Sequence, residues 1–158
     1  MDKNTPCPLL LEDFLPYQLS VLTNKISQKL ADYYSRQFAL TTLEWRVMAV
    51  LGEFDGLSAV QIAQRTEMDK VAVSRAIAGL LDKGYVTRRF LVKDKRCSVV
   101  RLSKAGNKTY QLIVPRALAY QMGLMSVLSP EEKVVLQAII GKLSACIDTQ
   151  DWQRGILM

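Results

Sequence analysis

Residues 58–102 constrain the fold most strongly, because a helical pattern there gives way within a few residues to an alternating one. Ser58 and Gln61 have the spacing of a capping box, which satisfies free backbone N–H groups and marks the start of a helix. We expect this helix over residues 59–66, packing through Val60, Ile62 and Ala63. A short turn then leads to a second helix, so the stretch begins as two helices packed as a pair.

The second helix is expected over residues 69–83, with Asp69 as its cap and Gly84 as its stop. Positions at 100° intervals give one face that can anchor the helix in a core: Val73, Ala76, Ile77, Leu80 and Leu81. The other face offers small side chains, a hydroxyl and a guanidinium: Val71, Ser74, Arg75, Ala78 and Asp82. Such a face can hydrogen-bond base edges or phosphates. The alternative is an ordinary amphipathic helix with a plain outer face.

After Gly84 the pattern alternates and predicts a hairpin with strands over residues 85–91 and 98–102. Residues 92–97 between them form a strongly basic tip. Asp94 lies close enough to Arg96 in the sequence to brace its guanidinium, which would stiffen the tip. The alternative is a solvated tip with a weak surface ion pair.

Positive charge is concentrated on this module. Residues 58–110 carry twelve Lys or Arg against four Asp or Glu, a net +8, whereas the whole chain is +6 and the remainder therefore −2. Such a local surplus is typical of a protein that meets a polyanion. Together the features predict a winged helix-turn-helix that binds double-stranded DNA. Its candidate DNA contacts are Lys70, Val71, Ser74, Arg75, Arg88, Lys95 and Arg96, with Asp94 bracing the wing.

Three runs of the sequence resemble the MarR family of bacterial transcriptional regulators: TTLEWRVMAVL, LSAVQIAQRTEMDKVAVSRAIAGLLDKGYVTRR and VKDKRCSVVRLSKAG. The D-x-R signature of the wing is matched at Asp94 and Arg96. The resemblance implies that Ser74 and Arg75 read the major groove and that Arg96 enters the minor groove, since a narrow groove attracts arginine. It also implies a symmetric homodimer.

Composition excludes several other classes. At 158 residues and 49% hydrophobic, the chain is most simply one compact domain with its own core. No apolar run approaches the roughly 20 residues of a membrane span, and residues 1–8 lack a secretory pattern, so we expect a cytoplasmic protein. The chain has no histidine, CxxC spacing, paired carboxylates or Gly-rich phosphate loop. We therefore expect no metal site, no cofactor and no catalytic residues, and hence no enzyme.

The cysteines suggest one alternative signal to which such a regulator could respond, namely an oxidant. The three cysteines, Cys7, Cys97 and Cys146, are far apart and fit reduced thiols. Some members of the resembled family sense oxidants through a cysteine within the first long helix. Here Cys7 precedes that helix, between two prolines. An oxidant-sensing regulator with the same fold is therefore the alternative hypothesis.

Long helices are expected before the module. The first covers residues 16–38, and a T-x-x-E capping box at Thr41 opens the next, over residues 42–54. The inward stripe of this second helix is expected to be Leu43, Val47, Val50, Leu51 and Phe54, with Trp45, Arg46 and Met48 pointing away. An aromatic ring next to a cationic side chain can form a binding site for an aromatic carboxylate. The candidate effector-binding residues are Tyr17, Tyr33, Trp45 and Arg46; simple packing is the alternative.

Two more helices follow the module. One is expected over residues 104–127 with a kink at Pro115, and the other over residues 130–149, opened by Ser129 and Glu132. The chain thus has a basic middle and apolar ends. We predict a mainly α fold with a small β-hairpin wing, in which residues 41–102 form the winged helix-turn-helix and residues 1–40 and 103–158 form dimerisation helices.

The sequence therefore predicts a homodimeric DNA-binding transcriptional regulator. We expect a repressor of a pseudo-palindromic operator, with half-sites about 10 bp apart, that a small aromatic ligand releases. An enzyme and a winged helix used only for protein contacts are the alternatives from other classes. The localised positive charge argues against the second of these.

Overall fold

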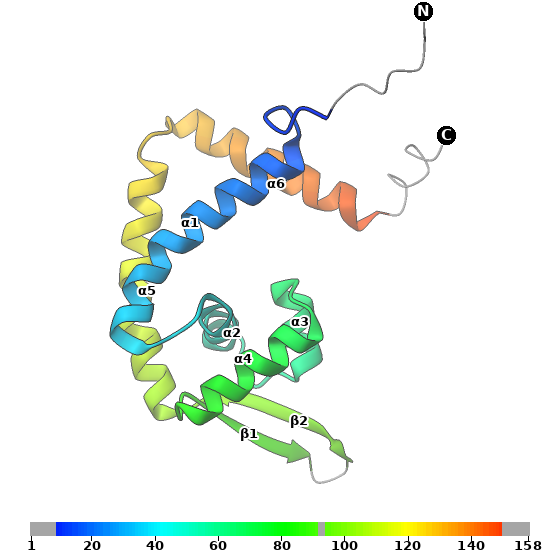
Figure 1. Ribbon diagram of the computed structural model, residues 1–158, viewed down its shortest axis with the longest axis vertical. Coiled ribbons are helices and arrows are strands. Elements are labelled where there is room, and N and C mark those ends of the chain that lie inside the picture. Colours follow the sequence, from blue (N-terminus) through cyan, green and yellow to red (C-terminus); the bar gives the residue numbers. More distant parts are fainter. Residues whose placement is uncertain (1–8, 92–93, 150–158) are drawn as a thin grey trace, which may run out of the picture. The chain divides into compact units, whose positions relative to one another are not determined.

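The structure, a computed structural model, describes residues 9–91 and 94–149, and for residues 91 and 94–97 it describes the backbone alone. Within these residues it contains helices and one antiparallel hairpin (Figure 1): α1 (Leu15–Phe38), α2 (Thr42–Glu53), α3 (Ala59–Thr66), α4 (Lys70–Asp82), β1 (Val86–Leu91), β2 (Asp94–Leu102), α5 (Lys104–Met125) and α6 (Pro130–Asp148). The predicted mainly α fold with a small hairpin is confirmed. Each predicted helix lies within two residues of the observed one.

Side-chain caps explain where the helices begin. The capping boxes at Thr41, Ser58 and Ser129 are all formed, each with both of its hydrogen bonds. The Asp69 carboxylate accepts a hydrogen bond of 2.8 Å from the Ala72 amide at the start of α4. These bonds satisfy backbone N–H groups that have no partner within a helix, so the helix starts follow directly from the sequence.

The chain divides into two compact units, Met1–Pro115 and Arg116–Met158, with the boundary inside α5. The first unit contains the hydrophobic core. Helices α2, α3 and α4 lie on one side of the hairpin (Figure 1), and α2 contacts α1, α3, α4 and β2. The buried apolar side chains are Tyr34, Leu40, Val47, Met48, Leu51, Leu57, Ile62, Val73, Ala76, Ile77, Leu80, Val86, Val100 and Ile113.

The predicted inward stripe of α2 was partly wrong. Met48, expected to point away from the core, is fully buried, and Leu43, expected inside, is 39% exposed. Trp45 also packs against the core instead of facing away from it. Because α2 lies between several elements, more than one side of it is covered, whereas the prediction assumed a single buried stripe.

The prediction for α3 was wrong at Val60, which is 55% exposed, while Ile62 is fully buried. Two residues that are two positions apart lie about 200° apart around a helix and cannot both face the same core. Ala63, next to Ile62, packs against the core as expected.

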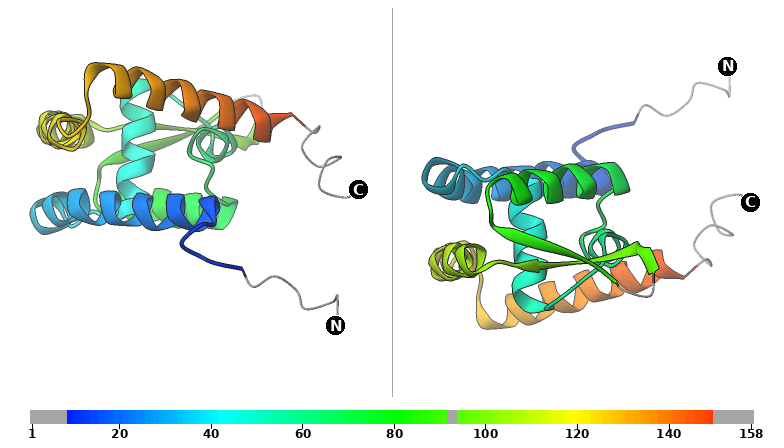
Figure 2. Two further views of the ribbon diagram at one scale, coloured as in Figure 1. Left: turned by 90° about the horizontal axis from the view of Figure 1, so that it is seen from above. Right: turned by 90° about the horizontal axis from the view of Figure 1, so that it is seen from below.

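The hairpin is longer than predicted on its return strand. Strand β2 begins at Asp94, not at Ser98, so much of the predicted loop 92–97 has strand backbone. Backbone pairing does not need apolar side chains, and the register between the strands shifts between Phe90 and Leu91. The view from below shows β1 leaving the end of α4 and β2 leading into the start of α5 (Figure 2).

The second unit, described to residue 149, is apolar but has no buried side chain. Helix α6 exposes a series of large hydrophobic side chains: Val134, Val135, Ile139, Ile140, Leu143 and Ile147. Pro115 lies within the continuous α5, and a kink there stays a prediction. No single helix among the described residues is long and apolar enough to cross a membrane; α5 and α6 reach that length and composition only together, across a sharp break.

Candidate nucleic-acid interface

The outer face of α4 is unobstructed within its unit. Lys70, Val71, Ser74 and Arg75 are all exposed, and Val71 retains 57% of its surface. The opposite face of the same helix is buried through Val73, Ala76, Ile77 and Leu80, as predicted. Four of the seven candidate DNA contacts therefore share one accessible surface, and the core fixes which way it points.

A tight connection holds α3 and α4 together. It consists of residues 67–69, and Glu67 adopts a left-handed backbone conformation (φ 51°) that reverses the chain. The Thr66 hydroxyl donates a hydrogen bond of 2.8 Å to the Ile62 carbonyl in the last turn of α3. Helix, short turn and helix, followed by a hairpin, is the arrangement of a winged helix-turn-helix.

Arg88 lies on the face of the hairpin that also carries the buried Val86 and Val100. Strand register places it opposite Val100, and its Nε donates a hydrogen bond of 2.8 Å to the Ser98 hydroxyl. Its guanidinium lies 5.8 Å from the centre of the Phe90 ring. The side chain is exposed but oriented by these neighbours, toward the same side of the hairpin as the helices.

The other face of the hairpin carries two further arginines, Arg89 and Arg101. Arg89 and Arg101 line a shallow groove of about 610 Å³ with Asp55, Thr87, Phe90, Val99 and Leu102. Arg101 Nη1 lies 2.6 Å from Asp55 Oδ2, and both side chains are largely exposed. Sequence reasoning missed this pair because its partners are 46 residues apart. An exposed pair of this kind contributes little to stability.

The tip of the hairpin carries three candidates whose side chains lie outside the described residues: Asp94, Lys95 and Arg96. The backbone of all three belongs to β2. Bracing of Arg96 by Asp94 therefore stays a prediction. Cys7, the residue of the oxidant-sensing alternative, also lies outside the described residues, so its role stays a hypothesis.

The four candidate effector residues do not form one cluster within the chain. Trp45 is stacked between Tyr34 and Tyr110, with ring centres 5.8 and 6.1 Å away, so both of its faces are covered. Tyr33 packs edge-on against Phe38. Tyr17 lies in the first turn of α1, and the helical rise puts it about 24 Å from Tyr33. Arg46 is half-buried in α2, next to Trp45.

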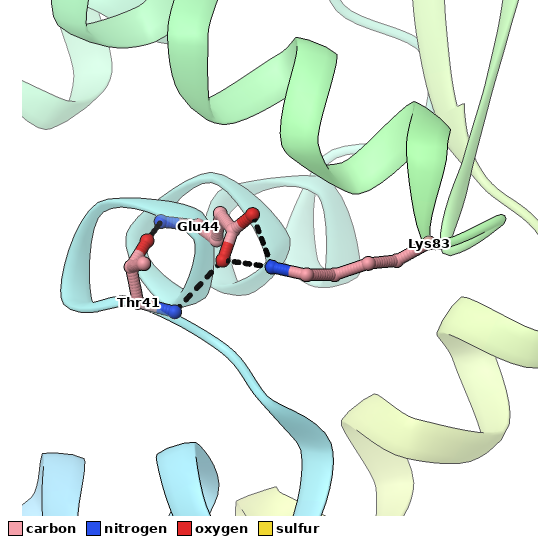
Figure 3. Close-up of polar contacts among 3 residues, drawn as sticks. All are labelled: Thr41, Glu44 and Lys83. Atoms are coloured by element: carbon pink, nitrogen blue, oxygen red, sulfur yellow. Dashed lines mark hydrogen bonds and ion pairs between the residues drawn. The ribbon is translucent and has the colours of Figure 1, made fainter.

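A partly buried ion pair joins α2 to α4 (Figure 3), in which Glu44 is buried and the Lys83 side chain is 30% exposed. Lys83, at the C-cap of α4, donates to both oxygens of Glu44, at 2.5 and 2.6 Å. Glu44 is only 4% exposed, and its Oε2 also accepts a hydrogen bond of 2.8 Å from the Thr41 amide. Burial alone would raise the pKa of the Glu44 carboxyl, but hydrogen bonds from Lys83 and Thr41 outweigh it, and the pKa lies below its usual 4.5. The sequence predicted the cap and missed Lys83.

Gly79 was the sequence signal that could have revealed this pair. A glycine inside a helix is about 1 kcal/mol less favourable than alanine, so its presence in α4 needs a reason. A Cβ at this position would collide with the Glu44 carboxylate. The glycine therefore makes room for that side chain to reach the last turn of α4.

The helix pair, the exposed outer face of α4 and the hairpin define a winged helix-turn-helix protein. A family model described as MarR family matches residues 40–96. The HTH-type transcriptional repressor YetL of Bacillus subtilis is 26% identical over 137 residues, which cover 84% of this chain and 79% of YetL.

Solved structures of transcriptional regulators share the fold of this chain. A MarR/EmrR family transcriptional regulator from Acinetobacter sp. ADP1 is 26% identical, with a TM-score of 0.81, and the match covers 89% of this chain and 99% of that one. The fold also matches the S. aureus MepR–DNA complex (TM-score 0.76, 23% identity, 84% and 98% covered). A third match is PcaV of Streptomyces coelicolor in complex with its natural ligand, with a TM-score of 0.75 and 16% identity; the match covers 88% of this chain and 97% of PcaV.

The chain matches the MarR family over residues 40–96 and shares its fold with solved MarR-family regulators. It is a winged helix-turn-helix transcriptional regulator that binds DNA, and not an enzyme.

The lowered pKa of Glu44 predicts how stability depends on pH. A carboxyl whose pKa is lower in the folded state stabilises the fold fully above its unfolded pKa of about 4.5 and loses this contribution as pH falls through the folded pKa. The unfolding free energy of the native chain should therefore exceed that of Glu44→Gln most at neutral pH, and the difference should shrink below about pH 4.5. Urea titrations between pH 3 and 7 measure it.

The matched control is Asp55→Asn, which removes the exposed carboxylate of the Asp55–Arg101 pair. Its effect on stability should be small at every pH, because solvent screens an exposed pair. A difference between native chain and Glu44→Gln that stays constant from pH 3 to 7 would contradict the lowered pKa of Glu44.

Proposed function

We propose that the protein acts as a homodimer on a pseudo-palindromic operator and represses transcription until a small ligand releases it. The observation that carries the dimer is the exposed apolar surface at both ends of the chain. Helix α6 is 19 residues long, has no buried residue and exposes Ile139, Ile140 and Ile147 by 49%, 55% and 67%. Leu9, Leu10 and Leu11 are similarly exposed. A soluble monomer rarely exposes this much contiguous apolar surface.

A second copy of the same chain would cover these surfaces. Closed two-fold symmetry is the commonest solution for a self-complementary apolar surface, and it presents two copies of α4 side by side. Two major-groove helices in a dimer match half-sites about one helical turn, or roughly 10 bp, apart. In this proposal residues 1–40 and 103–158 form the dimer and residues 41–102 bind DNA.

The proposed DNA contacts divide by surface. Ser74 and Arg75, with Val71, would read base edges in the major groove, and Arg96 at the hairpin tip would enter the minor groove. Lys70, Arg88 and Lys95 would contact phosphates. Supporting this division are the shared exposed face of α4, the oriented Arg88 and the fold likeness to a regulator solved with DNA.

Release by a ligand is the second part of the proposal. The related YetL is named a repressor, and PcaV was solved with its natural ligand. We infer an aromatic carboxylate that binds near Arg46 and Tyr33, beside the covered Trp45. Tyr17 would join such a site only from a second chain, because about 24 Å separates it from Tyr33. Oxidant sensing through Cys7 is the alternative trigger.

Arg75→Ala should relax sequence preference. Loss of a good base contact removes about 1–3 kcal/mol of discrimination at one position, so operator affinity should fall while affinity for a variant base pair there changes little. Fluorescence anisotropy with an operator and its single-base-pair variants measures this. Arg89→Ala, on the other face of the hairpin, is the matched control and should preserve the preference. An equal loss on every sequence would show that Arg75 contacts phosphates only.

Ile140→Asp should break the proposed dimer. A charge placed in a buried apolar interface lacks a partner and is costly to desolvate, so sedimentation equilibrium should find monomers at micromolar concentration, with weaker operator binding. Val60→Asp on α3 is the control, because both side chains are 55% exposed in the single chain. It should leave the dimer intact. A native chain that sediments as a monomer would refute the dimer outright.

Aromatic acids should weaken operator binding if one of them is the effector. Allosteric coupling is reciprocal, so operator DNA must weaken binding of that acid by the same factor, typically about 5–150-fold. Calorimetric titration with and without operator measures both factors. Arg46→Ala should keep operator affinity and lose the response. If no acid acts but peroxide releases the DNA, the Cys7 alternative replaces this proposal.

A further inference from the structure

The rotation of α4 about its axis decides which side chains face DNA, and its apolar contacts alone do not set it sharply. Val73, Ala76, Ile77 and Leu80 hold the helix by non-directional burial, which tolerates small rotations and shifts. The Glu44–Lys83 pair is different, because the Lys83 ammonium lies 2.5 and 2.6 Å from the two oxygens of the Glu44 carboxylate and so joins one defined point of α2 to one end of α4. It is a directional contact between α2 and the C-terminal end of α4 (Figure 3).

Glu44 itself is firmly held on the α2 side. Its carboxylate accepts from the Thr41 amide, and its own amide donates to the Thr41 hydroxyl at 3.2 Å. The next residue, Trp45, stacks between Tyr34 of α1 and Tyr110 of α5. The first turn of α2 is therefore a fixed base from which the carboxylate reaches α4.

Stability alone does not explain this arrangement. An ion pair with a buried carboxylate often gives no more stability than apolar residues of the same size, because the buried charge loses its hydration. Gly79, which the carboxylate needs as space, also weakens α4 by about 1 kcal/mol relative to alanine. Apolar residues at positions 44 and 83 with alanine at position 79 could give as stable a fold, so what this contact adds is a single defined position of α4.

We propose that Glu44 and Lys83 are positioning residues for base recognition, which fix the orientation of α4 so that Ser74 and Arg75 meet base edges. Lys83 lies eight residues beyond Arg75, about 12 Å along the helix, so a tilt about this end displaces the reading side chains. The inference rests on the proposed role of the outer face of α4.

The sign of the effect separates this role from two simpler ones. Glu44→Gln removes a negative charge from a protein that binds a polyanion, so electrostatics alone predicts tighter binding to any DNA. A purely structural role predicts no change once the variant is fully folded. Positioning predicts weaker binding to the operator and no loss of binding to unrelated DNA. Glutamine also serves in a capping box, so the substitution keeps the Thr41 cap and removes only the charge pairing.

The experiment measures the affinity of native protein and Glu44→Gln for operator and for unrelated duplex DNA, at a temperature where circular dichroism shows both fully folded. We expect operator affinity to fall about ten-fold or more, the loss of roughly one good base contact, with affinity for unrelated DNA unchanged or higher. Unchanged or tighter operator binding would overturn the proposal. If the native protein does not prefer its operator, the proposed function fails instead, so the two failures are distinguishable.

Two further variants keep the test decisive if Glu44→Gln does not fold. Gly79→Ala changes no charge and displaces the Glu44 carboxylate, so the ratio of operator to unrelated affinity should fall. Lys83→Met should also lower the ratio, whereas a mere phosphate contact of Lys83 would lower both affinities equally. An unchanged ratio in both variants would overturn the proposal.

Asp55→Asn is the control for the loss of any ion pair in this unit. Like Glu44→Gln, this substitution removes a carboxylate that lies near a cation. The side chains of Asp55 and Arg101 are, however, 72% and 54% exposed. We expect it to leave the ratio unchanged, because an exposed pair fixes no element in place. A fall equal to that of Glu44→Gln would show that the readout follows charge and not position.

Discussion

Burial of one face of α4 is the interaction on which the rest of the structure depends. Val73, Ala76, Ile77 and Leu80 enter the core, and this alone turns Ser74 and Arg75 outward. Burial of an aliphatic side chain stabilises a fold by about 1.5–3 kcal/mol, more than any exposed polar contact here. The helix therefore has a buried side and an exposed side, which we propose contacts DNA, and the first determines the direction of the second. The hairpin depends on the same core, since Val86 and Val100 are buried in it.

Charge and apolar surface are separated along the chain, and each has its own task. The surplus of cations lies between residues 58 and 110, on the unit that holds the core. The large exposed apolar side chains lie mainly in α1, in the later part of α5 and in α6. Cations favour a polyanion and apolar surface favours another protein surface, so one chain presents two kinds of binding surface that do not compete. This separation fits a regulator that binds DNA as an assembly.

Two ion pairs join parts of the first unit that lie far apart in the sequence, and they differ in what they can do. The Asp55–Arg101 pair is exposed and leaves both partners screened by water. The Glu44–Lys83 pair is shielded and tied to a capping box, so its geometry is defined on both helices. Only a contact of the second kind can fix the orientation of one helix relative to another. The pair lies between the first turn of α2, where Trp45 stacks against Tyr34 of α1 and Tyr110 of α5, and the C-terminal end of α4, whose outer face we propose contacts DNA.

The sequence by itself determined the helix ends, the amphipathic division of α4, the hairpin and the basic module. These depend on local rules: caps satisfy nearby N–H groups, and periodicity decides which side chains share a face. It did not determine that Met48 is buried, that Val60 is exposed, that Trp45 is covered on both faces or that Lys83 reaches Glu44. Each of those facts depends on which distant elements meet, and only tertiary structure decides that. Glu44 and Lys83 are 39 residues apart, and the sequence around either residue does not predict its contact with the other.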